Sequence, residues 1–438
     1  MAMTEPATIY APATAPGEAA IAVVRVSGPA AGATLRALSG RAPPPPRTAT
    51  LRQLRHPESG APIDEALVLW FAAPASYSGE DMVEYHIHGG AAVQAALLDA
   101  LAACAGLAPA PPGGFTRQAV RNGRMDLLRA EAIADLIAAD SPAQHAQALA
   151  QKAGGLGALY EGWRQRLTDA LAHMEAGLEF ADEDLPSTLD ECAQRAAQGV
   201  ADEITTHLAD TRGERLRTGL TVALLGAPNV GKSSLLNRLA GREAAIVSAR
   251  AGTTRDVLEV GLRLEGLPLV LVDTAGLRAA RGTIEREGVR RARARARDAD
   301  MRLFLCAPRQ LAVPQMAQLQ RRGDILVYNK ADLRGRAPPD SLPVSARTGA
   351  GLTALLKLLG ERLRSRFAPR AAPALTRARH RRALEDAAEA LARAKAETAA
   401  ELVAENLRLA EQALAQLTGH ANMERVLDAV FRDFCIGK

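Results

Sequence analysis

The segment from Gly226 to Ser234, GAPNVGKSS, has the residue types and spacing of a phosphate-binding loop. An apolar, β-favouring run precedes it from Leu220 to Leu225, and residues 235–240 after it have helical spacing. At such a junction the backbone N–H groups and the helix N-terminus face an anion, while Lys232 adds a positive charge and Ser233 a hydroxyl for Mg²⁺. The alternative, a glycine-rich turn without a nucleotide, is disfavoured by the strand and the helix on either side.

Further nucleotide motifs follow in order between residues 216 and 363, where strand-like and helical runs alternate. GTTRD at 252–256 offers a threonine to Mg²⁺ and the γ-phosphate, and DTAG at 273–276, directly after an apolar strand, offers a carboxylate to the metal. NKAD at 329–332 ends in a carboxylate that can accept both N–H donors of a guanine edge, and SAR at 345–347 backs the base. Together these motifs predict GTP as the nucleotide.

The residue after the DTAG motif is Leu277, where Ras-like enzymes have a glutamine that orients the attacking water. A leucine side chain cannot hold a water, so another group must orient it and another must neutralise charge. Glu285 is a candidate through a bridging water, and the arginines of the run from Arg290 to Arg297 could supply charge. The same run also reads as a solvated helix face, because helical periodicity spreads its arginines around the axis.

Composition places the chain among ordinary globular proteins, with 48% hydrophobic and 24% charged residues in a length of 438. That length suggests roughly two to four domains. No apolar run reaches the roughly 18 residues that span a bilayer, and no basic segment precedes an apolar core at the start, so we expect a cytoplasmic protein.

The four cysteines are far apart and lack zinc spacing. A net charge of +5 is compatible with an RNA partner, and 3% aromatic residues argue against reading single-stranded bases by stacking.

Short strand-like runs at 21–26, 66–71 and 82–87 and a helical run at 91–105 predict a small α+β domain at the N-terminal end. Within it, Arg25, Glu80, His86 and His88 are either a ligand site or polar groups at strand ends. Residues 125–207, with a break at 182–186, and residues 375–434 have helical periodicity. Since neither block alone would bury its apolar stripe, we predict one bundle with the nucleotide domain inserted into it.

Beyond these nucleotide motifs, the chain resembles the bacterial and organellar tRNA-modification GTPases of the MnmE (TrmE) family over nearly its whole length. Its C-terminal residues, FCIGK, are the most diagnostic, because other small GTPases with the same nucleotide motifs lack them. The residues that carry the resemblance are Thr8 and Ile9, Pro16 and Gly17, 21–25, 76–84 (SYSGEDMVE), 88–90 (HGG), 113–116 (GGFT), 122–127, 130–137 (AEAIADLI) and 434–438.

The resemblance implies an α/β and α+β multidomain fold in which a Ras-like P-loop G domain is inserted into a helical bundle. The implied domains are an α+β tetrahydrofolate-binding and dimerisation domain at 1–121, the two helical segments at 122–214 and 367–438, and the G domain at 215–366. The family works as a homodimer and in a heterotetramer with a flavin-dependent partner, MnmG (GidA), which holds the FAD.

The resemblance also implies the reaction. Such proteins modify C5 of the wobble uridine, position 34, of certain tRNAs with a carboxymethylaminomethyl or aminomethyl group. The one-carbon unit comes from a 5,10-methylene or 5-formyl tetrahydrofolate, and the amine from glycine or ammonium.

In this family K⁺ takes the place of an arginine finger when two G domains meet, which agrees with the missing glutamine. The resemblance assigns K⁺ ligands to Asn229, Ser248, Arg250 and Thr253 and Mg²⁺ ligands to Ser233 and Thr254. It assigns catalytic roles to Glu285 and Lys232. The nucleotide-binding positions are Asn229, Val230, Gly231, Lys232, Ser233, Ser234, Ser248, Ala249, Arg250, Ala251, Gly252, Thr253, Thr254, Asp273, Thr274, Ala275, Gly276, Asn329, Lys330, Ala331, Asp332, Ser345, Ala346 and Arg347.

Folate contacts map by resemblance to Arg25, Glu80, Arg124 and Lys438, with Arg124 standing where the family often has lysine. Cys435 is the family's candidate thiol nucleophile, and a structural role for it stays open.

There are also departures from the family pattern. Pro111 and Gly114 replace an arginine and an acidic residue that are usual in the family, so any folate or partner contact made there would be weaker. The segment from 306 to 325 is short, which should trim a peripheral part of the G domain.

Two other readings are weaker. A ribosome-assembly switch of the Era or Der kind would need a KH-like domain or a second G domain, and the sequence shows neither. A scaffold that binds nucleotide without hydrolysing it is disfavoured by Ser233, Thr254 and Asp273.

Overall fold

The computed structural model describes residues 8–179, 188–241, 259–273, 296–308, 320–368 and 373–419, together with residues 294, 310, 427, 428, 430, 431, 434 and 437. These residues form two compact units: Met1–Ala134 with Gly157–Ala201 and Asp386–Lys438, and Asp135–Leu156 with Asp202–Glu385. The finer domain boundaries given above stay predictions. In the described ranges no helix has the length and apolarity to cross a bilayer.

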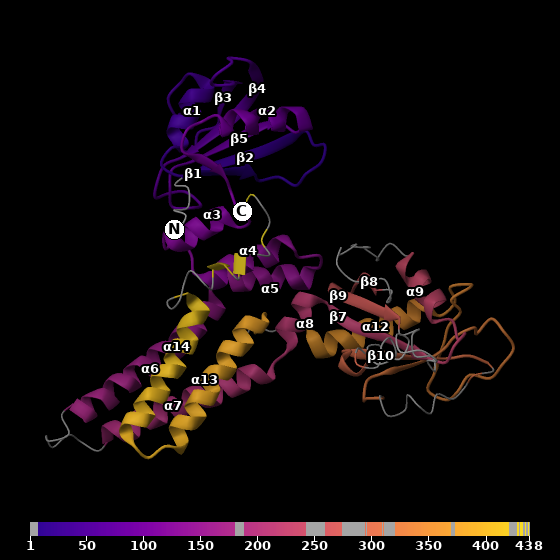
Figure 1. Cartoon of the computed structure of the whole chain (residues 1–438). Coiled ribbons are helices and arrows are strands. Elements are labelled where there is room, and N and C mark those ends of the chain that lie inside the picture. Colours follow the sequence, from indigo (N-terminus) through magenta and orange to yellow (C-terminus); the bar gives the residue numbers. More distant parts are fainter. Residues whose placement is uncertain are drawn as a thin grey trace, which may run out of the picture. The chain divides into compact units, whose positions relative to one another are not determined.

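The N-terminal domain is built on a mixed six-stranded sheet in the order β3-β4-β5-β2-β1-β6 (Figure 1). Only β1 and β6 pair in parallel. The strands are β1 (Thr8–Pro12), β2 (Ile21–Ser27), β3 (Thr50–Arg55), β4 (Pro62–Phe71), β5 (Met82–His88) and β6 (Leu107–Pro109). The predicted strands at 21–26, 66–71 and 82–87 and the helix at 91–105 are confirmed, the helix ending earlier, at Ala102.

The two faces of this sheet differ, because side chains alternate along each strand. One face is covered by α1 (Ala31–Ser39) and α2 (Ala91–Ala102), whose leucines pack on Val24, Val68 and Tyr85. On the other face, α3 (Gly114–Arg121) contributes Phe115 to a small cluster with β1. Towards β3 that second face is open.

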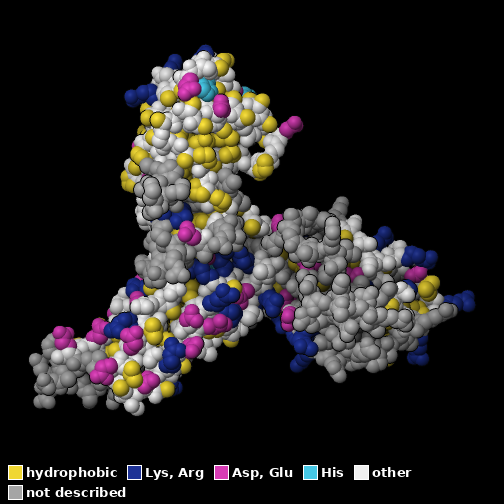
Figure 2. All heavy atoms as spheres, viewed as in Figure 1, with side chains coloured by type: hydrophobic (Ala, Val, Ile, Leu, Met, Phe, Trp, Pro, Cys, Tyr) yellow, Lys and Arg dark blue, Asp and Glu magenta, His cyan; other side chains and the backbone are white. Residues whose placement is uncertain are grey.

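Hydrophobic side chains reach the surface of the N-terminal domain (Figure 2). The large ones on its strands are Ile21, Leu51 and Leu67, which are 59%, 57% and 39% exposed. Leu51 lies opposite Leu67 and Leu67 opposite His86 in the strand register, so these side chains share the open face.

Four helices from both sides of the nucleotide domain form a bundle: α6 (Gly155–Glu179), α7 (Thr188–Ala209), α13 (Ala378–Ala396) and α14 (Ala400–Thr418), seen side by side in Figure 1. Arg164 of α6 bonds Glu411 of α14 at 2.9 Å, and Arg408 bonds Glu175 at 2.7 Å. The prediction of one bundle made from two sequence segments is therefore confirmed. The predicted break at 182–186 lies outside the described residues.

The helical run before the bundle is divided further, into α4 (Leu127–Ile137) and α5 (Pro142–Lys152). Ser141 begins α5 by accepting a hydrogen bond from the backbone N–H of Gln144 at 3.2 Å, and Pro142 occupies the first turn, where it needs no N–H donor. Ala143 joins the core of the G domain, so α5 belongs to the second unit.

The G domain has a six-stranded sheet in the order β12-β11-β10-β7-β9-β8, parallel except for β8. Its strands are β7 (Leu220–Gly226), β8 (Glu259–Leu264), β9 (Leu267–Asp273), β10 (Met301–Cys306), β11 (Ile325–Tyr328) and β12 (Leu342–Pro343). Side chains of α9 (Lys232–Ala240) and α12 (Leu352–Phe367) cover one face, and Ala296 and Ala299 pack against the other. Burial on both faces explains the continuous apolar runs that predict β7, β9 and β11.

Candidate functional site

The predicted phosphate-binding loop joins the end of β7 at Gly226 to the start of α9 at Lys232. The Lys232 side chain turns back over this loop, and its Nζ donates to the carbonyl oxygens of Gly226 at 2.9 Å and Ala227 at 3.0 Å. Gly231 has φ +95°, and a Cβ on it would lie 2.4 Å from Nδ2 of Asn329, so no other residue fits there. The loop carbonyls thus hold the Lys232 ammonium over the loop, at the N-terminal end of α9.

The Mg²⁺ assignment is tested by the oxygens beside this loop. Oγ of Ser233 lies 2.6 Å from Oδ2 of Asp273 at the end of β9, because β9 pairs in parallel with β7. Oδ1 of Asp273 is buried and accepts no hydrogen bond from any described residue. A hydroxyl and a carboxylate with a spare buried oxygen fit a hard cation.

Asn329 joins the phosphate loop to the loop behind the base. Its Nδ2 donates to the carbonyl oxygen of Val230 at 2.8 Å, and its Oδ1 accepts from the backbone N–H of Ala346 at 3.1 Å. Lys330, at φ +61°, reaches over the loop and donates to the carbonyl oxygen of Asn229 at 2.7 Å. Asn329 is buried, so this link is rigid.

The carboxylate of Asp332, which is predicted to read the guanine edge, is held in place from two sides. Oγ of Ser345 lies 2.6 Å from its Oδ1, and Nη2 of Arg347 lies 2.8 Å from its Oδ2. The hydrogen bond from Ser345 is the largest cause that lowers the pKa of Asp332, with the Arg347 charge adding to it. A lowered pKa keeps the carboxylate ionised, and able to accept two N–H donors, as the pH falls towards the usual value for aspartate.

We expect Ser345→Ala to weaken GDP binding about tenfold at neutral pH, because a hydrogen bond to a charged group is lost. On acidification the variant should also begin to lose affinity at a higher pH than the native chain, close to the ordinary pKa of aspartate, because the pKa of Asp332 rises towards that value when the Ser345 hydrogen bond is lost. Titration of a fluorescent GDP analogue measures both effects. Ser365→Ala on α12 is the matched control, and equal affinity for the Ser345 and Ser365 variants would contradict the assigned role.

Several assigned site residues lie outside the described residues: Ser248, Ala249, Arg250, Ala251, Gly252, Thr253, Thr254, Thr274, Ala275, Gly276, Glu285, Cys435 and Lys438. Most of the arginine run at 290–297 lies outside as well, as do residues 309 and 311–319 of the short segment at 306–325. The roles given to these residues stay predictions.

The described folate candidates gather around the loop at 76–80. Glu80 accepts a hydrogen bond from Nδ2 of Asn122 at 3.2 Å, and a Cβ on Gly79 would lie 3.0 Å from Cγ of Arg124. Arg25 lies over the ring of Tyr77, with its guanidinium carbon 5.3 Å from the centroid. The loop at 76–80 therefore contains Glu80 and lies next to Arg25 and Arg124.

Described residues near the C-terminal signature also pack on the N-terminal domain. Phe431 and Phe434 join Val120 in a buried cluster, and Arg117 pairs with Asp428 at 2.9 Å. A Cβ on Gly437 would lie 1.9 Å from the carbonyl oxygen of Pro12, and this glycine has φ +96°. Gly437 thus lies beside the end of β1.

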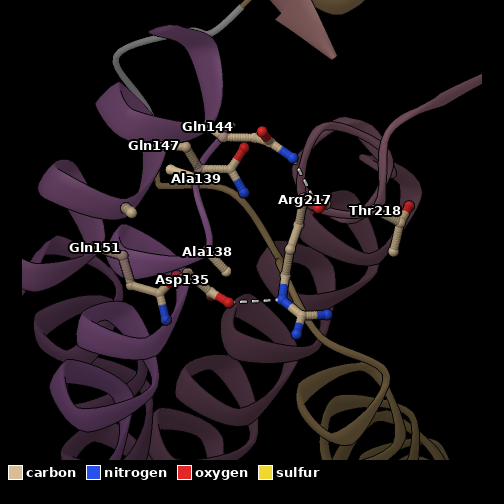
Figure 3. A pocket seen from close by; sticks show the side chains of 9 residues that line it. Asp135, Ala138, Ala139, Gln144, Gln147, Gln151, Arg217 and Thr218 are labelled. Carbon is tan, nitrogen blue, oxygen red and sulfur yellow. Dashed lines mark hydrogen bonds and ion pairs between the residues drawn. The ribbon is translucent and has the colours of Figure 1, made fainter. Parts of the chain in front are cut away.

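A polar hollow of about 220 Å³ lies between α5 and α8 (Arg212–Thr218), the helix that leads into β7 (Figure 3). Its polar side chains bond one another: Nε of Arg217 donates to Asp135 at 2.9 Å, and Nε2 of Gln144 donates to the carbonyl oxygen of Arg217 at 3.1 Å. Asp135 also accepts from Nη2 of Arg377 at 2.8 Å. None of the phosphate-loop residues lines this hollow. We therefore assign its polar side chains to the packing of α5 against α8.

Two features escaped the sequence analysis. Glu84 bonds Arg25, but only the pairing of β2 with β5 brings together residues so far apart in the chain. Arg302 is buried in β10, and the one signal for it is a charged residue inside an otherwise apolar strand, MRLFLC.

Family models and relatives of known name match nearly the whole chain. Residues 8–124 match the family model described as the GTP-binding protein TrmE N-terminus, and residues 127–435 match the MnmE helical domain. A tRNA modification GTPase MnmE from Parvibaculum lavamentivorans is 54% identical over 98% of this chain and 100% of that protein. The protein of the same name from Rhodospirillum rubrum is 51% identical over 98% and 99%. A solved structure of Era from Aquifex aeolicus aligns with 39% of this chain and 66% of that one, at 25% identity and a TM-score of 0.28.

Proposed function

This chain belongs to the MnmE (TrmE) family of tRNA-modification GTPases, and from this premise we propose that it hydrolyses GTP in a K⁺-dependent manner to modify tRNA. The modification is at C5 of the wobble uridine, position 34, which receives a carboxymethylaminomethyl or aminomethyl group. The observation that carries most weight for GTP is the meeting of the phosphate loop with Asp273 and Asn329 at the ends of parallel strands.

The predicted site residues divide the work on GTP among themselves. Lys232 holds the β- and γ-phosphates, and Asp332 with Ser345 and Ala346 reads the guanine edge. Ser233 and Asp273, with Thr254, would hold Mg²⁺, which neutralises developing charge on the phosphate oxygens when bound. Catalysis of this kind depends mainly on positioning and electrostatic stabilisation, which suits groups fixed at the ends of strands.

Water activation is the part that this chain must arrange differently from Ras. Because Leu277 cannot orient a water, we assign that role to Glu285, acting through a bridging water. Asn229, Ser248, Arg250 and Thr253 are the proposed K⁺ ligands. In support, Asn229 occupies φ +62° in the phosphate loop, a conformation that asparagine adopts more readily than most residues.

The test is GTP turnover by the full chain in K⁺ and in Na⁺ at matched ionic strength. We expect K⁺ to raise turnover by about tenfold or more, because a cation in place of an arginine finger stabilises transition-state charge. Asn229→Ala should lose this stimulation while GDP affinity is kept, whereas Asn237→Ala on α9 should keep both. Equal rates of the native chain in the two salts would refute the K⁺ assignment.

For the N-terminal domain we propose tetrahydrofolate binding, as the 5,10-methylene or 5-formyl derivative, through Arg25, Glu80, Arg124 and Lys438. Its support is the gathering of the three described candidates around one loop. A homodimer through this domain is supported by the exposed leucines of the open sheet face, since apolar patches of this kind mark interaction surfaces.

The remaining partners follow from the family. We propose a heterotetramer with MnmG (GidA), which would hold the FAD, with tRNA as the common substrate in the cytoplasm. Cys435 is a candidate nucleophile in this scheme.

A further inference from the structure

Arg25 is held on several sides within the open face of the N-terminal sheet. Its Nη2 and Nε donate to the same oxygen, Oε1 of Glu84, at 2.7 and 3.1 Å. The rings of Tyr77 and Phe115 lie 5.3 and 5.4 Å from the guanidinium carbon, which is within the range of cation–π attraction. The plane and direction of this guanidinium are thus fixed before any ligand binds.

The contact between Arg25 and Glu84 is built into the sheet. The two residues are directly opposed in the antiparallel pairing of β2 with β5, so the backbone ladder sets the distance between them. Their side chains are only 19% and 15% exposed, which makes this pair stronger than an ion pair in open solvent. Tyr77 is fixed in turn, because its hydroxyl lies 2.8 Å from Oγ1 of Thr116.

The second oxygen of Glu84 faces a histidine on the same strand. Nε2 of His86 lies 3.6 Å from Oε2 of Glu84, and this nitrogen is buried without a hydrogen bond to any described residue. The carboxylate therefore stands between Arg25 and His86, with one oxygen directed at each.

We propose that Glu84 is a positioning residue for the folate site, acting through Arg25; this inference rests on the proposed binding of folate. The Nε and Nη2 edge of Arg25 is engaged by Glu84, while Nη1 makes no hydrogen bond within the described part of the chain. Nη1 is the group that remains to bind an anionic or carbonyl oxygen of the ligand. Glu84 thus determines which edge of Arg25 the ligand meets.

A positioning role and a merely neutralising role predict opposite effects. If Glu84 only cancelled the charge of Arg25, its removal would strengthen the binding of an anionic folate. If Glu84 orients Arg25, its removal frees the guanidinium to rotate and weakens binding, because the ordering of that side chain must then accompany association. The sign of the change in affinity therefore distinguishes the two roles.

The experiment is titration of the full chain with 5-formyltetrahydrofolate, comparing Glu84→Gln with the native protein. We expect the dissociation constant to rise about tenfold, the effect of losing a hydrogen bond between charged groups. Glu58→Gln, in the exposed turn between β3 and β4, is the matched control and should bind as the native chain does. Thermal unfolding followed by circular dichroism should be the same in all three proteins, which shows that each is folded.

A double-mutant comparison with Arg25 distinguishes a positioning role of Glu84 from a general structural role. Arg25→Lys should weaken binding in the native background and have a smaller effect in the Glu84→Gln background, since the lysine has no fork to orient. Unchanged or tighter binding by Glu84→Gln would overturn the inference and leave the folate proposal standing. Absence of folate binding by the native chain would overturn both.

Discussion

Lys232→Ala is expected to lower GTP turnover by about 10²–10³-fold, the cost of removing one preorganised group that stabilises transition-state charge. The Nζ atom is fixed over the phosphate loop by the carbonyl oxygens of Gly226 and Ala227, and the residue is 8% exposed. Its charge is therefore already placed where phosphate oxygens would bind, and water does not screen it strongly.

Single-turnover hydrolysis of radiolabelled GTP at saturating nucleotide separates this effect from weakened binding. Lys357→Ala, an exposed lysine on α12, removes the same charge from the same domain without touching the loop. Turnover by the Lys232 variant within threefold of that control would be incompatible with a phosphate-stabilising role.

The second large effect concerns stability. Asp324→Ala should lower the free energy of unfolding of the G domain by about 3–5 kcal/mol, because it leaves a buried guanidinium without its counter-charge. Arg302 and Asp324 have side chains 1% and 3% exposed, with Nη1 of the arginine 3.4 Å from the carboxylate. The same carboxylate accepts the backbone N–H groups of Arg302 at 3.0 Å and Arg321 at 2.7 Å, and these would be orphaned too.

Urea unfolding, followed by circular dichroism without nucleotide, measures this loss. Asp298→Ala is the control, because it removes one carboxylate from an exposed position in the same domain. Replacing both partners together, Arg302→Met with Asp324→Leu, should cost less than Asp324→Ala alone, since no buried charge is then unpaired. A single variant as stable as the Asp298 control would show that water or another group already satisfies Arg302.

Arg302 also shows which features the sequence could not predict. Its Nε and Nη2 donate to the carbonyl oxygens of Ala296, Arg297 and Ala299 at 2.8 to 3.1 Å, where they satisfy the end of a helical turn that precedes β10. Nothing in the spacing of MRLFLC indicates which carbonyls a buried arginine will reach. That information lies in the packing of the sheet.

Other elements could be predicted because a short stretch of sequence is enough to indicate each of them. The strands of the G domain carry continuous apolar runs, and the phosphate loop has glycines at the positions where the backbone must turn. The division between α4 and α5 was missed, although Asp140, Ser141 and Pro142 give a local signal for a helix start. The contact of Arg25 with Glu84 had no such signal, since a strand register decides it.

The helical bundle has a consequence for how the protein is made. Residues 210–377 separate α7 from α13, so α6 and α7 leave the ribosome roughly ten to thirty seconds before their partner helices exist. During that interval α6, whose Tyr160, Trp163 and Leu167 are buried in the finished protein, lacks the two later helices of its bundle. The G domain, whose sheet is continuous in sequence, can fold first. The newly made chain is therefore most vulnerable to aggregation while its central domain is already complete.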